Sequence, residues 1–523
     1  MSGGEASSRG RAAGERAGPE EWPFDTVLVA NRGEIAVRIV QACREMGLRS
    51  VAVYSEPDRL APHVLMADEA VPLGPAPAAE SYLDMDRLLA AARRAGAGAV
   101  HPGYGFLAEN AEFAERVASS ELTWVGPPAP AIAAMGNKTE ARRRMREAGV
   151  PVIPGTESAA ADAREAAEAA EEIGYPVMLK AAAGGGGKGM RVVREPDGLA
   201  SALESARNEA RQAFGDDRVY LERFLDRPRH IEIQVLADDH GSTVHLGERE
   251  CSIQRRHQKL VEEAPSPVLD SATRSEMGRV AVEAAEAVDY RGAGTVEFLY
   301  QEGEYFFLEM NTRIQVEHPV TEMVTGVDLV REQLRVAAGR PLGWEPDPDW
   351  PRGHAIECRI SGEDPASGFL PSSGRITTLR VPGGPGVRWD AGIEEGFEVG
   401  LHYDPLLAKL VVHGPDRPAA IRRMRRALAQ LQVEGVSTTQ PFHLAVMEEE
   451  DFREGRLDIH YVDEHPEVTG RSLPEDWRRA AAVAAALLRE ERGDGAGSTG
   501  GPSGRERDGG VGRSAWRRAF DPR

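Results

Sequence analysis

The sequence predicts an α/β protein of about two to four domains, because 523 residues are too many for one ordinary core. Two further observations support this fold class. Predicted strands and helices alternate from Phe24 onward, as in a layered α/β domain. Later segments alternate apolar and polar residues around short turns, which is typical of β-hairpins.

The first region begins with a β-α-β unit. "DTVLVA" predicts a strand, "RGEIAVRIVQACREMG" has the apolar spacing of a helix, and "RSVAVYS" predicts a second strand. "AGAGAVHPGYGFLAEN" and "LTWVGP" continue the alternation, and His101 is expected to shape the "HPGYG" loop. The region therefore predicts a doubly wound α/β layer that ends near Gly136. Its first turn lacks the G-x-G-x-x-G pattern, so dinucleotide binding is not supported there.

A second region mixes helices, strands and hairpins, and a third carries short β segments. In the second region a helix is expected over Ser158–Ile173, and a hairpin that turns at Gln301–Gly303. The third region starts at "GHAIECRISGED" and contains one basic helix, Arg417–Leu431. After Pro466 the chain becomes polar, and its glycine- and serine-rich end is expected to be disordered.

Charge and cysteine content exclude several classes of protein. A formal net charge of -21 argues against a protein that binds nucleic acid or an anionic membrane. The three cysteines are far apart in the sequence, which indicates a reducing compartment without a disulfide framework. No apolar segment is long enough to span a bilayer, and the N-terminus lacks the apolar core of a signal peptide. We therefore expect a cytoplasmic protein.

The glycine-rich segment "YPVMLKAAAGGGGKGMRVV" predicts a phosphate-binding flap. Residues 184–189 match G-x-G-x-x-G, but a strand is expected after them, whereas a Rossmann loop needs a helix. A P-loop is also excluded, because Gly189 follows Lys188 where Ser or Thr is required. Strand, glycine turn and strand form a hairpin whose backbone N–H groups can approach phosphate oxygens. Lys180 ends the preceding strand and can reach the same phosphates.

The segment "EMNTRIQVEHP" places a polar side chain at every second position. In an extended chain these side chains lie on one face, and pairing across the hairpin would bring Glu297 opposite Glu309. Two carboxylates and the Asn311 amide oxygen are suitable ligands for magnesium shared with nucleotide phosphates. The alternative is a solvated hairpin face with salt bridges, which explains Glu302 and Glu304 well but explains Glu297 poorly, because the neighbours of Glu297 are apolar.

Three further residues continue the polar row. Arg313 can bind a planar oxyanion, Gln315 can add a donor, and Glu317 can act as a general base. The order metal, anion and base indicates a small oxyanion that is activated by ATP.

At these residues the chain resembles biotin carboxylase, an ATP-grasp enzyme. The resemblance rests on several long stretches in the same order, which are far more specific than one glycine motif. These stretches are "VLVANRGEIAVRI", "HPGYGFLAEN", "KAAAGGGGKGMRVV", "RHIEIQVLAD", "CSIQRRHQKLVEEAP", "EMNTRIQVEHPVTE" and "GHAIECRISGEDP".

The resemblance implies an ATP-grasp fold flanked by an N-terminal doubly wound α/β domain and a C-terminal mixed α/β domain. The implied limits are a disordered tail over 1–22, an N-terminal domain over 23–136, an ATP-grasp domain over 137–350 with a mobile lid near 152–225, a C-terminal domain over 351–466 and a polar tail over 467–523.

The resemblance also implies the reaction and its residues. ATP phosphorylates bicarbonate to carboxyphosphate, which releases carbon dioxide beside biotin, whose N1 is carboxylated. ATP-binding positions are Lys138, Lys180, Gly185, Gly186, Gly187, Glu222, Leu225, His230, Gln254, His257, Glu297 and Glu309. The implied metal ligands are Glu297, Glu309 and Asn311. The implied bicarbonate site consists of Lys259, Arg313, Gln315 and the backbone of Val316. Glu317 is the implied base, and Arg359 is the implied cation that stabilises the biotin enolate. The implied ion is Mg2+, with Mn2+ as the alternative.

The sequence differs from the family pattern at two positions of the flap, and it lacks a motif that bears on the expected partners. Ala183 and Lys188 replace a glycine and an arginine that the family often carries in the flap. The carrier motif "AMKM" does not occur in this sequence, so biotin is expected on a separate carrier protein, with separate carboxyltransferase subunits and a homodimeric enzyme. An acyl-CoA carboxylase, such as acetyl-CoA carboxylase, and a two-subunit pyruvate carboxylase both remain open as the parent complex. Another ATP-grasp ligase and a non-catalytic nucleotide-binding regulator are the more distant alternatives.

Overall fold

The structure is a computed structural model that describes residues 22–156, 158–181, 190–214, 217–470 and 483. The described chain up to Gly470 belongs to one compact unit. The glycines Gly185, Gly186 and Gly187, and nearly all of both predicted tails, lie outside the described residues. None of the described helices is long and apolar enough to cross a membrane.

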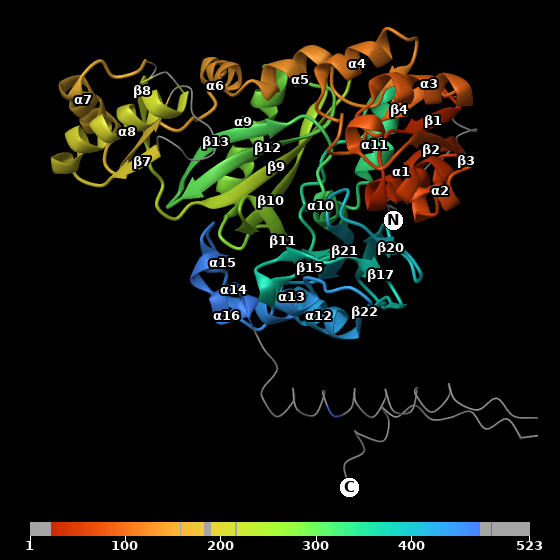
Figure 1. The fold of residues 1–523 in the computed structure, drawn as a ribbon. Coiled ribbons are helices and arrows are strands. Elements are labelled where there is room, and N and C mark those ends of the chain that lie inside the picture. The colour runs from red at the N-terminus through yellow and green to blue at the C-terminus, as the bar shows by residue number, and fades with distance from the viewer. Residues whose placement is uncertain (1–21, 157, 182–189, 215–216, 471–482, 484–523) are drawn as a thin grey trace, which may run out of the picture. The chain divides into compact units, whose positions relative to one another are not determined.

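A parallel sheet with the order β3-β2-β1-β4-β5 forms the first region (Figure 1). Successive strands are added first on one side of β1 and then on the other, which is the doubly wound arrangement that the sequence predicts. Its strands are β1 (Thr26–Val29), β2 (Arg49–Ser55), β3 (Glu69–Gly74), β4 (Ala99–His101) and β5 (Thr123–Trp124). Its helices are α1 (Gly33–Glu45), α2 (Pro62–Met66), α3 (Met85–Ala95), α4 (Ala111–Ala118) and α5 (Ala129–Gly136).

The loop after β4 has the shape expected from "HPGYG". The buried His101 accepts a hydrogen bond at Nδ1 from the Gly103 N–H, at 3.1 Å. Burial lowers the pKa of His101 to about 3, so the ring is neutral and available as an acceptor. His101 therefore has a structural role, as the sequence indicates.

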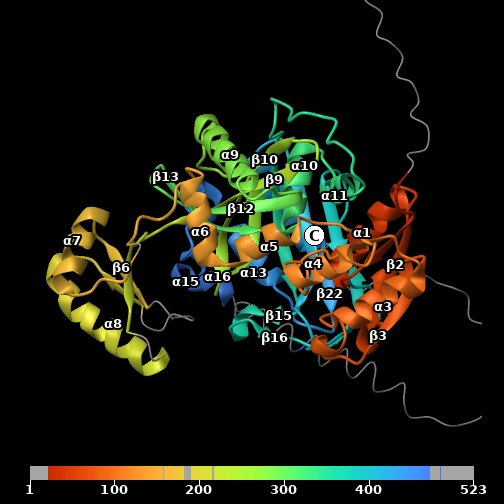
Figure 2. The ribbon, with the colours of Figure 1, turned by 90° about the horizontal axis from the view of Figure 1, so that it is seen from above.

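A three-stranded antiparallel sheet, β7-β6-β8, lies in the segment predicted as the lid, and α7 and α8 pack against it (Figure 2). The bounds are α7 (Ala163–Ile173), β6 (Val177–Ala181), β7 (Met190–Val193), α8 (Leu199–Phe214) and β8 (Val219–Arg223). The expected start of α7 at Ser158 is wrong, because the Asp162 carboxylate caps the helix by accepting from the Glu165 N–H at 2.8 Å. Strands β6 and β7 pair as the flap prediction requires.

An eight-stranded antiparallel sheet with the order β13-β12-β9-β10-β11-β14-β21-β19 carries most of the polar residues singled out above. Its strands are β9 (Arg229–Ala237), β10 (Thr243–Arg255), β11 (Gln258–Ala264), β12 (Gly292–Gln301), β13 (Glu304–Asn311), β14 (His354–Ser361), β19 (Val387–Ala391) and β21 (Leu406–Gly414). Helices on this part of the chain are α6 (Lys138–Glu147), α9 (Ser271–Glu286), α10 (His318–Thr325) and α11 (Leu329–Ala337).

The third region contains more helix than the single one expected. Helix α12 (Arg417–Gln430) matches the predicted basic helix to within one residue, and its buried face packs against β21 and β14. Four short helices follow: α13 (Gln440–Val446), α14 (Glu450–Glu454), α15 (Tyr461–Glu464) and α16 (Pro466–Thr469). Three two-stranded ladders complete the region: β15 (Glu363–Asp364) with β16 (Leu370–Pro371), β17 (Gly374–Arg375) with β20 (Glu398–Val399), and β18 (Thr378–Arg380) with β22 (Gln432–Glu434).

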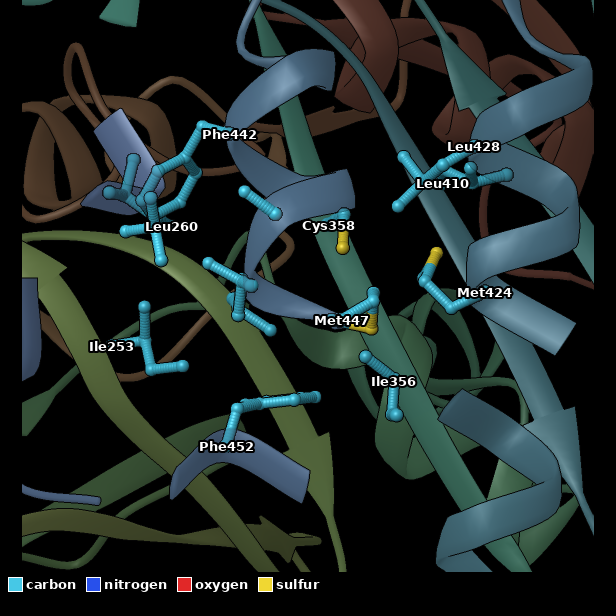
Figure 3. Close-up of a cluster of buried hydrophobic side chains, with 14 of the residues drawn as sticks. Ile253, Leu260, Ile356, Cys358, Leu410, Met424, Leu428, Phe442, Met447 and Phe452 are labelled. Atoms are coloured by element: carbon cyan, nitrogen blue, oxygen red, sulfur yellow. The ribbon is translucent and has the colours of Figure 1, made fainter. Parts of the chain in front are cut away.

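An apolar cluster fixes α12 and the short helices to the large sheet (Figure 3). Ile356 and Cys358 of β14 and Leu410 of β21 meet Met424 and Leu428 of α12. Alternate residues of the same strands point to the opposite face of the sheet. That opposite face carries polar side chains, which begin the candidate site.

Candidate active site

A row of charged residues crosses four neighbouring strands of the large sheet. Arg249 of β10 is paired with Glu232 of β9, Glu232 with Glu297 of β12, and Glu297 with Glu309 of β13. The β12–β13 turn has positive φ at Glu302 and Gly303, as a two-residue hairpin turn requires. The predicted pairing of Glu297 with Glu309 is confirmed.

A β-bulge produces that pairing. From the turn, the ladder continues regularly to Phe298 opposite Phe307, so the next position of β12 would face Leu308. The register shifts there by one residue, and Glu297 faces Glu309 instead. The bulge therefore brings the second carboxylate beside the first.

Lys259 of β11 joins three of the acids. Its Nζ lies 2.5 Å from Glu232 Oε2, 3.0 Å from Glu297 Oε1 and 2.6 Å from Glu317 Oε1. Burial favours the neutral amine, but the three negative charges outweigh it and raise the pKa of Lys259 well above its ordinary value. Lys259 is therefore a permanent cation at the centre of the cluster.

The expectation of an extended row beyond Asn311 is wrong. Strand β13 ends at Asn311, and the chain then turns through residues 312–317 into α10. The polar side chains still converge, because the turn points Gln315 Nε2 to Glu297 Oε1 at 2.7 Å. Arg313 donates to Asn311 Oδ1 and to Glu109 Oε2, both at 2.8 Å. A turn, and not a strand, therefore assembles this part of the row.

Glu317 and Arg359 form the end of the cluster that points to β14. Arg359 Nη2 donates to Glu317 Oε2 at 2.9 Å, and its Nε donates to Glu262 Oε1 at 2.6 Å. Burial opposes ionisation of Glu317, but Lys259 and Arg359 outweigh burial and hold its pKa below the ordinary value. Glu317 is therefore ionised at neutral pH and present as a proton acceptor.

Glu297, Glu309 and Asn311 fit a hard cation. Burial, followed by the neighbouring charge of Glu297, raises the pKa of Glu309, so the two carboxylates repel each other. A divalent ion beside Glu309 would remove this repulsion, and carboxylate and amide oxygens are the ligands that magnesium prefers. Asn311 Nδ2 donates to Glu297 Oε1 at 2.8 Å, and its Oδ1 accepts from Arg313, which leaves one lone pair of that oxygen for a metal ion.

The predicted nucleotide-binding residues are divided between the lid and the large sheet. Glu222 of β8 pairs with Lys180 of β6 and with Arg142 of α6, and Leu225 is buried just after β8. Lys138 is exposed, with its Nζ 3.9 Å from Glu309 Oε2. Of the predicted nucleotide-binding residues that the structure describes, Lys180 and Glu222 therefore form an ion pair with each other between β6 and β8.

Three predicted nucleotide contacts lie on β9, near the end of β10 and in the β10–β11 turn. His230 Nε2 is 2.7 Å from Glu297 Oε2. Gln254 is paired with Lys259 across β10 and β11, which places it beside the cluster. His257 is exposed in the turn after β10, with a φ of +67°, and its side chain is not brought to the acids.

Comparison with known proteins identifies the family. Residues 23–132 match the model of the biotin carboxylase N-terminal domain, residues 137–344 that of the carbamoyl-phosphate synthase L chain ATP-binding domain, and residues 357–464 that of the biotin carboxylase C-terminal domain. A protein named biotin carboxylase from Haemophilus influenzae is 52% identical over 441 residues, which are 84% of this chain and 98% of that protein. The chain belongs to the biotin carboxylase family. It is an ATP-dependent ligase with the ATP-grasp fold.

Other members of the biotin carboxylase family are similarly close. A pyruvate carboxylase subunit of Methanothermobacter thermautotrophicus is 54% identical over 442 residues, covering 84% of this chain and 90% of that protein. The biotin carboxylase domain dimer of Hydrogenobacter thermophilus 2-oxoglutarate carboxylase, solved with MgADP, ADP and bicarbonate, superimposes with a TM-score of 0.75. It is 47% identical, and the match covers 87% of this chain and all of that chain.

Sequence reasoning missed several residues of this biotin carboxylase site. Glu232 and Arg249 are fully buried in the charged row, Glu262 binds Arg359, and the buried Lys409 donates to the Val316 carbonyl at 2.8 Å. Glu232 and Lys409 each lie between two apolar residues of a strand, as in "HIEIQV" around Glu232, whereas Arg249 and Glu262 have charged residues beside them. A charged residue between apolar neighbours is the signal that could have identified Glu232 and Lys409, because it needs a buried partner.

Proposed function

We propose that the chain catalyses the ATP- and bicarbonate-dependent carboxylation of biotin, through carboxyphosphate, on a biotin carrier protein. The observation that carries this proposal is the convergence of Lys259, Gln315, Glu317 and Arg359 beside Glu297. Two cations, an amide donor and an ionised carboxylate thus lie beside Glu297, one of the two carboxylates proposed to hold the metal. This set suits an oxyanion that must be held, deprotonated and phosphorylated in one place.

Bicarbonate would bind to Lys259, Arg313, the Gln315 amide and the backbone of Val316. Lys259 and Arg313 supply positive charge, and both are kept protonated by the acids around them. Glu317 accepts the bicarbonate proton, which leaves a dianion whose oxygen attacks the γ-phosphorus of ATP. ADP leaves and carboxyphosphate forms, so the atoms balance without another reactant.

Glu297, Glu309 and Asn311 would hold Mg2+ at the nucleotide, where a divalent ion neutralises phosphate charge. The MgADP in the related 2-oxoglutarate carboxylase domain supports this assignment. Lys180 and Lys138 would bind the phosphates of the nucleotide. Lys180 forms an ion pair with Glu222, so a phosphate that binds to Lys180 would have to replace Glu222 as its partner.

Arg359 would stabilise the negative oxygen that develops on the ureido group of biotin. Burial opposes its charge, but Glu262 and Glu317 raise the pKa of Arg359, so the guanidinium stays cationic. Because Arg359 bonds directly to Glu317, the base and the enolate-binding cation are neighbours. Carbon dioxide released from carboxyphosphate would thus form beside the activated nitrogen.

Acetyl-CoA or another acyl-CoA is the final acceptor that we favour, with pyruvate as the second candidate. The pyruvate carboxylase subunit of Methanothermobacter thermautotrophicus, 54% identical over 442 residues, supports pyruvate. The biotin carboxylase of Haemophilus influenzae is nearly as similar, with 52% identity over 441 residues, so this similarity does not decide for pyruvate. We further propose a homodimer in the cytoplasm, which works with a separate biotin carrier and carboxyltransferase subunits. The related 2-oxoglutarate carboxylase domain, which is a dimer, supports the homodimer.

ADP release from Mg-ATP and bicarbonate, measured with and without free biotin, tests the proposal. Bicarbonate-dependent release that biotin stimulates is the expected result. Release that requires ammonia instead would assign the chain to another class of ATP-grasp ligase. Absence of release even with a biotinylated carrier protein would contradict the proposal.

Glu317→Gln tests the assigned base. The substitution is nearly isosteric, and we expect turnover to fall by about 100- to 10,000-fold, as for loss of a general base. Glu304→Gln is the matched control, because Glu304 is a carboxylate on the exposed part of β13 and contacts only the lid residue Arg223 in its ion pair. Turnover close to that of the wild type in Glu317→Gln would refute the assignment.

A further inference from the structure

Arg249 lies behind the proposed bicarbonate site and takes no part in the chemistry assigned above. Its side chain is fully buried. We propose that Arg249 is a positioning residue, which fixes the Gln315 amide with its nitrogen toward bicarbonate and holds Glu232 against Lys259. This inference rests on the proposed function, because it assigns the orientation of that same site.

All five N–H donors of the Arg249 guanidinium are used. Nε donates to Glu232 Oε1 at 2.5 Å, and Nη2 donates to Gln315 Oε1 at 2.5 Å. The remaining acceptors are Gln234 Oε1 at 2.7 Å, Thr321 Oγ1 at 2.9 Å and Thr295 Oγ1 at 3.1 Å. A guanidinium has five N–H donors, so the arrangement is complete. The acceptors come from β9, β12, the turn after β13 and α10, and Arg249 thus joins four segments.

The first consequence concerns the Gln315 amide. Its Oε1 accepts from Arg249, and its Nε2 therefore points to Glu297 Oε1. The opposite orientation would direct the amide NH2 at a guanidinium NH2, which places two donors together and leaves both without an acceptor. Arg249 thereby makes Gln315 a donor on the side of the proposed anion. An amide oxygen on that side would repel bicarbonate.

The second consequence concerns Lys259. Glu232 receives Arg249 on Oε1 and Lys259 on Oε2, so one carboxylate is held between two cations. The cross-strand pairing of Arg249 with Glu232 fixes the carboxylate from behind. Glu232 then directs the Lys259 ammonium to the space that it shares with Glu297 and Glu317. Arg249 thus acts on two bicarbonate-binding groups without touching the substrate.

A lysine could not replace Arg249 here. Its single ammonium has three donors and no planar fork, so it cannot reach acceptors on four segments together. Arg249→Lys therefore keeps the buried charge and removes the orientation. This variant separates the positioning role from simple neutralisation of Glu232.

The test is steady-state ADP release by the full chain, with ATP and bicarbonate varied separately. For Arg249→Lys we expect KM for bicarbonate to rise about 10- to 100-fold, as for loss of a hydrogen bond to a charged group. KM for ATP should change by less than about threefold, because Arg249 does not approach the lid residues. In a Gln315→Ala background, Arg249→Lys should raise KM for bicarbonate by a smaller factor, because Gln315, one of the two residues that Arg249 positions, is already removed.

Arg417→Lys is the matched control. Arg417 is also a largely buried arginine, and it donates to Glu263 Oε2 at 2.7 Å and to the Phe452 carbonyl at 2.7 Å on the other face of the sheet. Its substitution should lower stability without a selective effect on bicarbonate. Thr321→Val removes one acceptor of Arg249 with little change of volume, and it should give a weaker form of the bicarbonate effect if Arg249→Lys does not fold.

Two results would overturn the inference. One is an unchanged KM for bicarbonate in folded Arg249→Lys, or in Thr321→Val where the lysine variant does not fold. The other is an equal rise in both KM values. Failure of the proposed function itself would appear separately, as wild-type protein that shows no bicarbonate-dependent ADP release.

Discussion

Neighbouring acids on β11 should respond to the same substitution in opposite ways. Glu262 and Glu263 are both buried, and they point to opposite faces of the large sheet. Burial raises the pKa of Glu262 to about 7, although Arg359 opposes the rise. Burial also acts on Glu263, but Arg417 and His354 outweigh it and lower its pKa to about 2. Glu262→Gln and Glu263→Gln remove one charge each from the same strand.

The expected magnitudes follow from these pKa values. Folding raises the pKa of Glu262 from 4.5 to about 7, so an ionised Glu262 destabilises the protein by about 3 kcal/mol at pH 8, and this cost disappears as the pH falls below 4.5. Glu262→Gln should therefore stabilise the protein by up to about 3 kcal/mol at pH 8 and by only about 1 kcal/mol at pH 5. For Glu263 the sign is reversed. Its contribution of about 3 kcal/mol is present above pH 4.5 and is lost as the pH falls toward about 2.

Urea denaturation of the full chain at pH 5, 6, 7 and 8, without ligands, measures both effects. Glu263→Gln should lower the free energy of unfolding by a nearly constant amount across this range. The difference between Glu262→Gln and the wild type should grow with pH. The reasoning would be refuted if both variants were destabilised equally, or if the Glu262→Gln difference did not depend on pH.

Three further substitutions test other parts of the structure. Lys409 donates to the Val316 carbonyl at 2.8 Å and pairs with Glu34 at 3.1 Å. Lys409→Met should therefore raise KM for bicarbonate, and Glu34→Gln should raise it less. Equal effects of the two variants in steady-state assays would contradict this expectation. Glu309→Gln should raise the magnesium concentration needed for half-maximal ADP release by about tenfold or more, as for loss of a charged ligand, and an unchanged magnesium titration would remove Glu309 from the metal site. Asp162→Ala should destabilise α7 by about 1 kcal/mol, seen as faster amide exchange in its first turn; unchanged exchange would argue against the cap.

Local patterns predicted four of the five strands of the first sheet and the β12–β13 hairpin, but they did not predict β3, α2 or α3. The β-α-β alternation predicted strands and helices in the right order, because each element there has a clear period and a short connection. The pairing of Glu297 with Glu309 was also predicted, but the turn alone would have placed Leu308 opposite Glu297. The bulge that shifts the register lies between Phe298 and Glu297 in the β12–β13 ladder, and the alternating pattern of these strands does not predict it.

For the site beyond Asn311, the sequence predicted which polar residues take part but not the conformation of the backbone that carries them. Alternation in "TRIQVE" satisfies the rule for a strand, yet the backbone turns, because Arg249 and Lys409 bind Gln315 and the Val316 carbonyl from behind. Those two cations lie 66 and 93 residues away in the chain. Local propensity cannot anticipate contacts over such distances, and tertiary bonding decides the conformation.

The order of strands in the large sheet has a consequence for how the protein reaches its native state. β11 pairs with β14, in which Cys358 lies opposite Val261 after a long intervening segment that contains β12 and β13 together with α9, α10 and α11. Such a pairing carries a high loop-closure cost and is expected late in folding. Until it forms, the edge of β11 is open and Arg359 is absent from Glu317 and Glu262. During synthesis, the β12–β13 hairpin, which is proposed to hold the metal, can therefore exist before Arg359 is in place, and the complete site is among the last parts of the molecule to assemble.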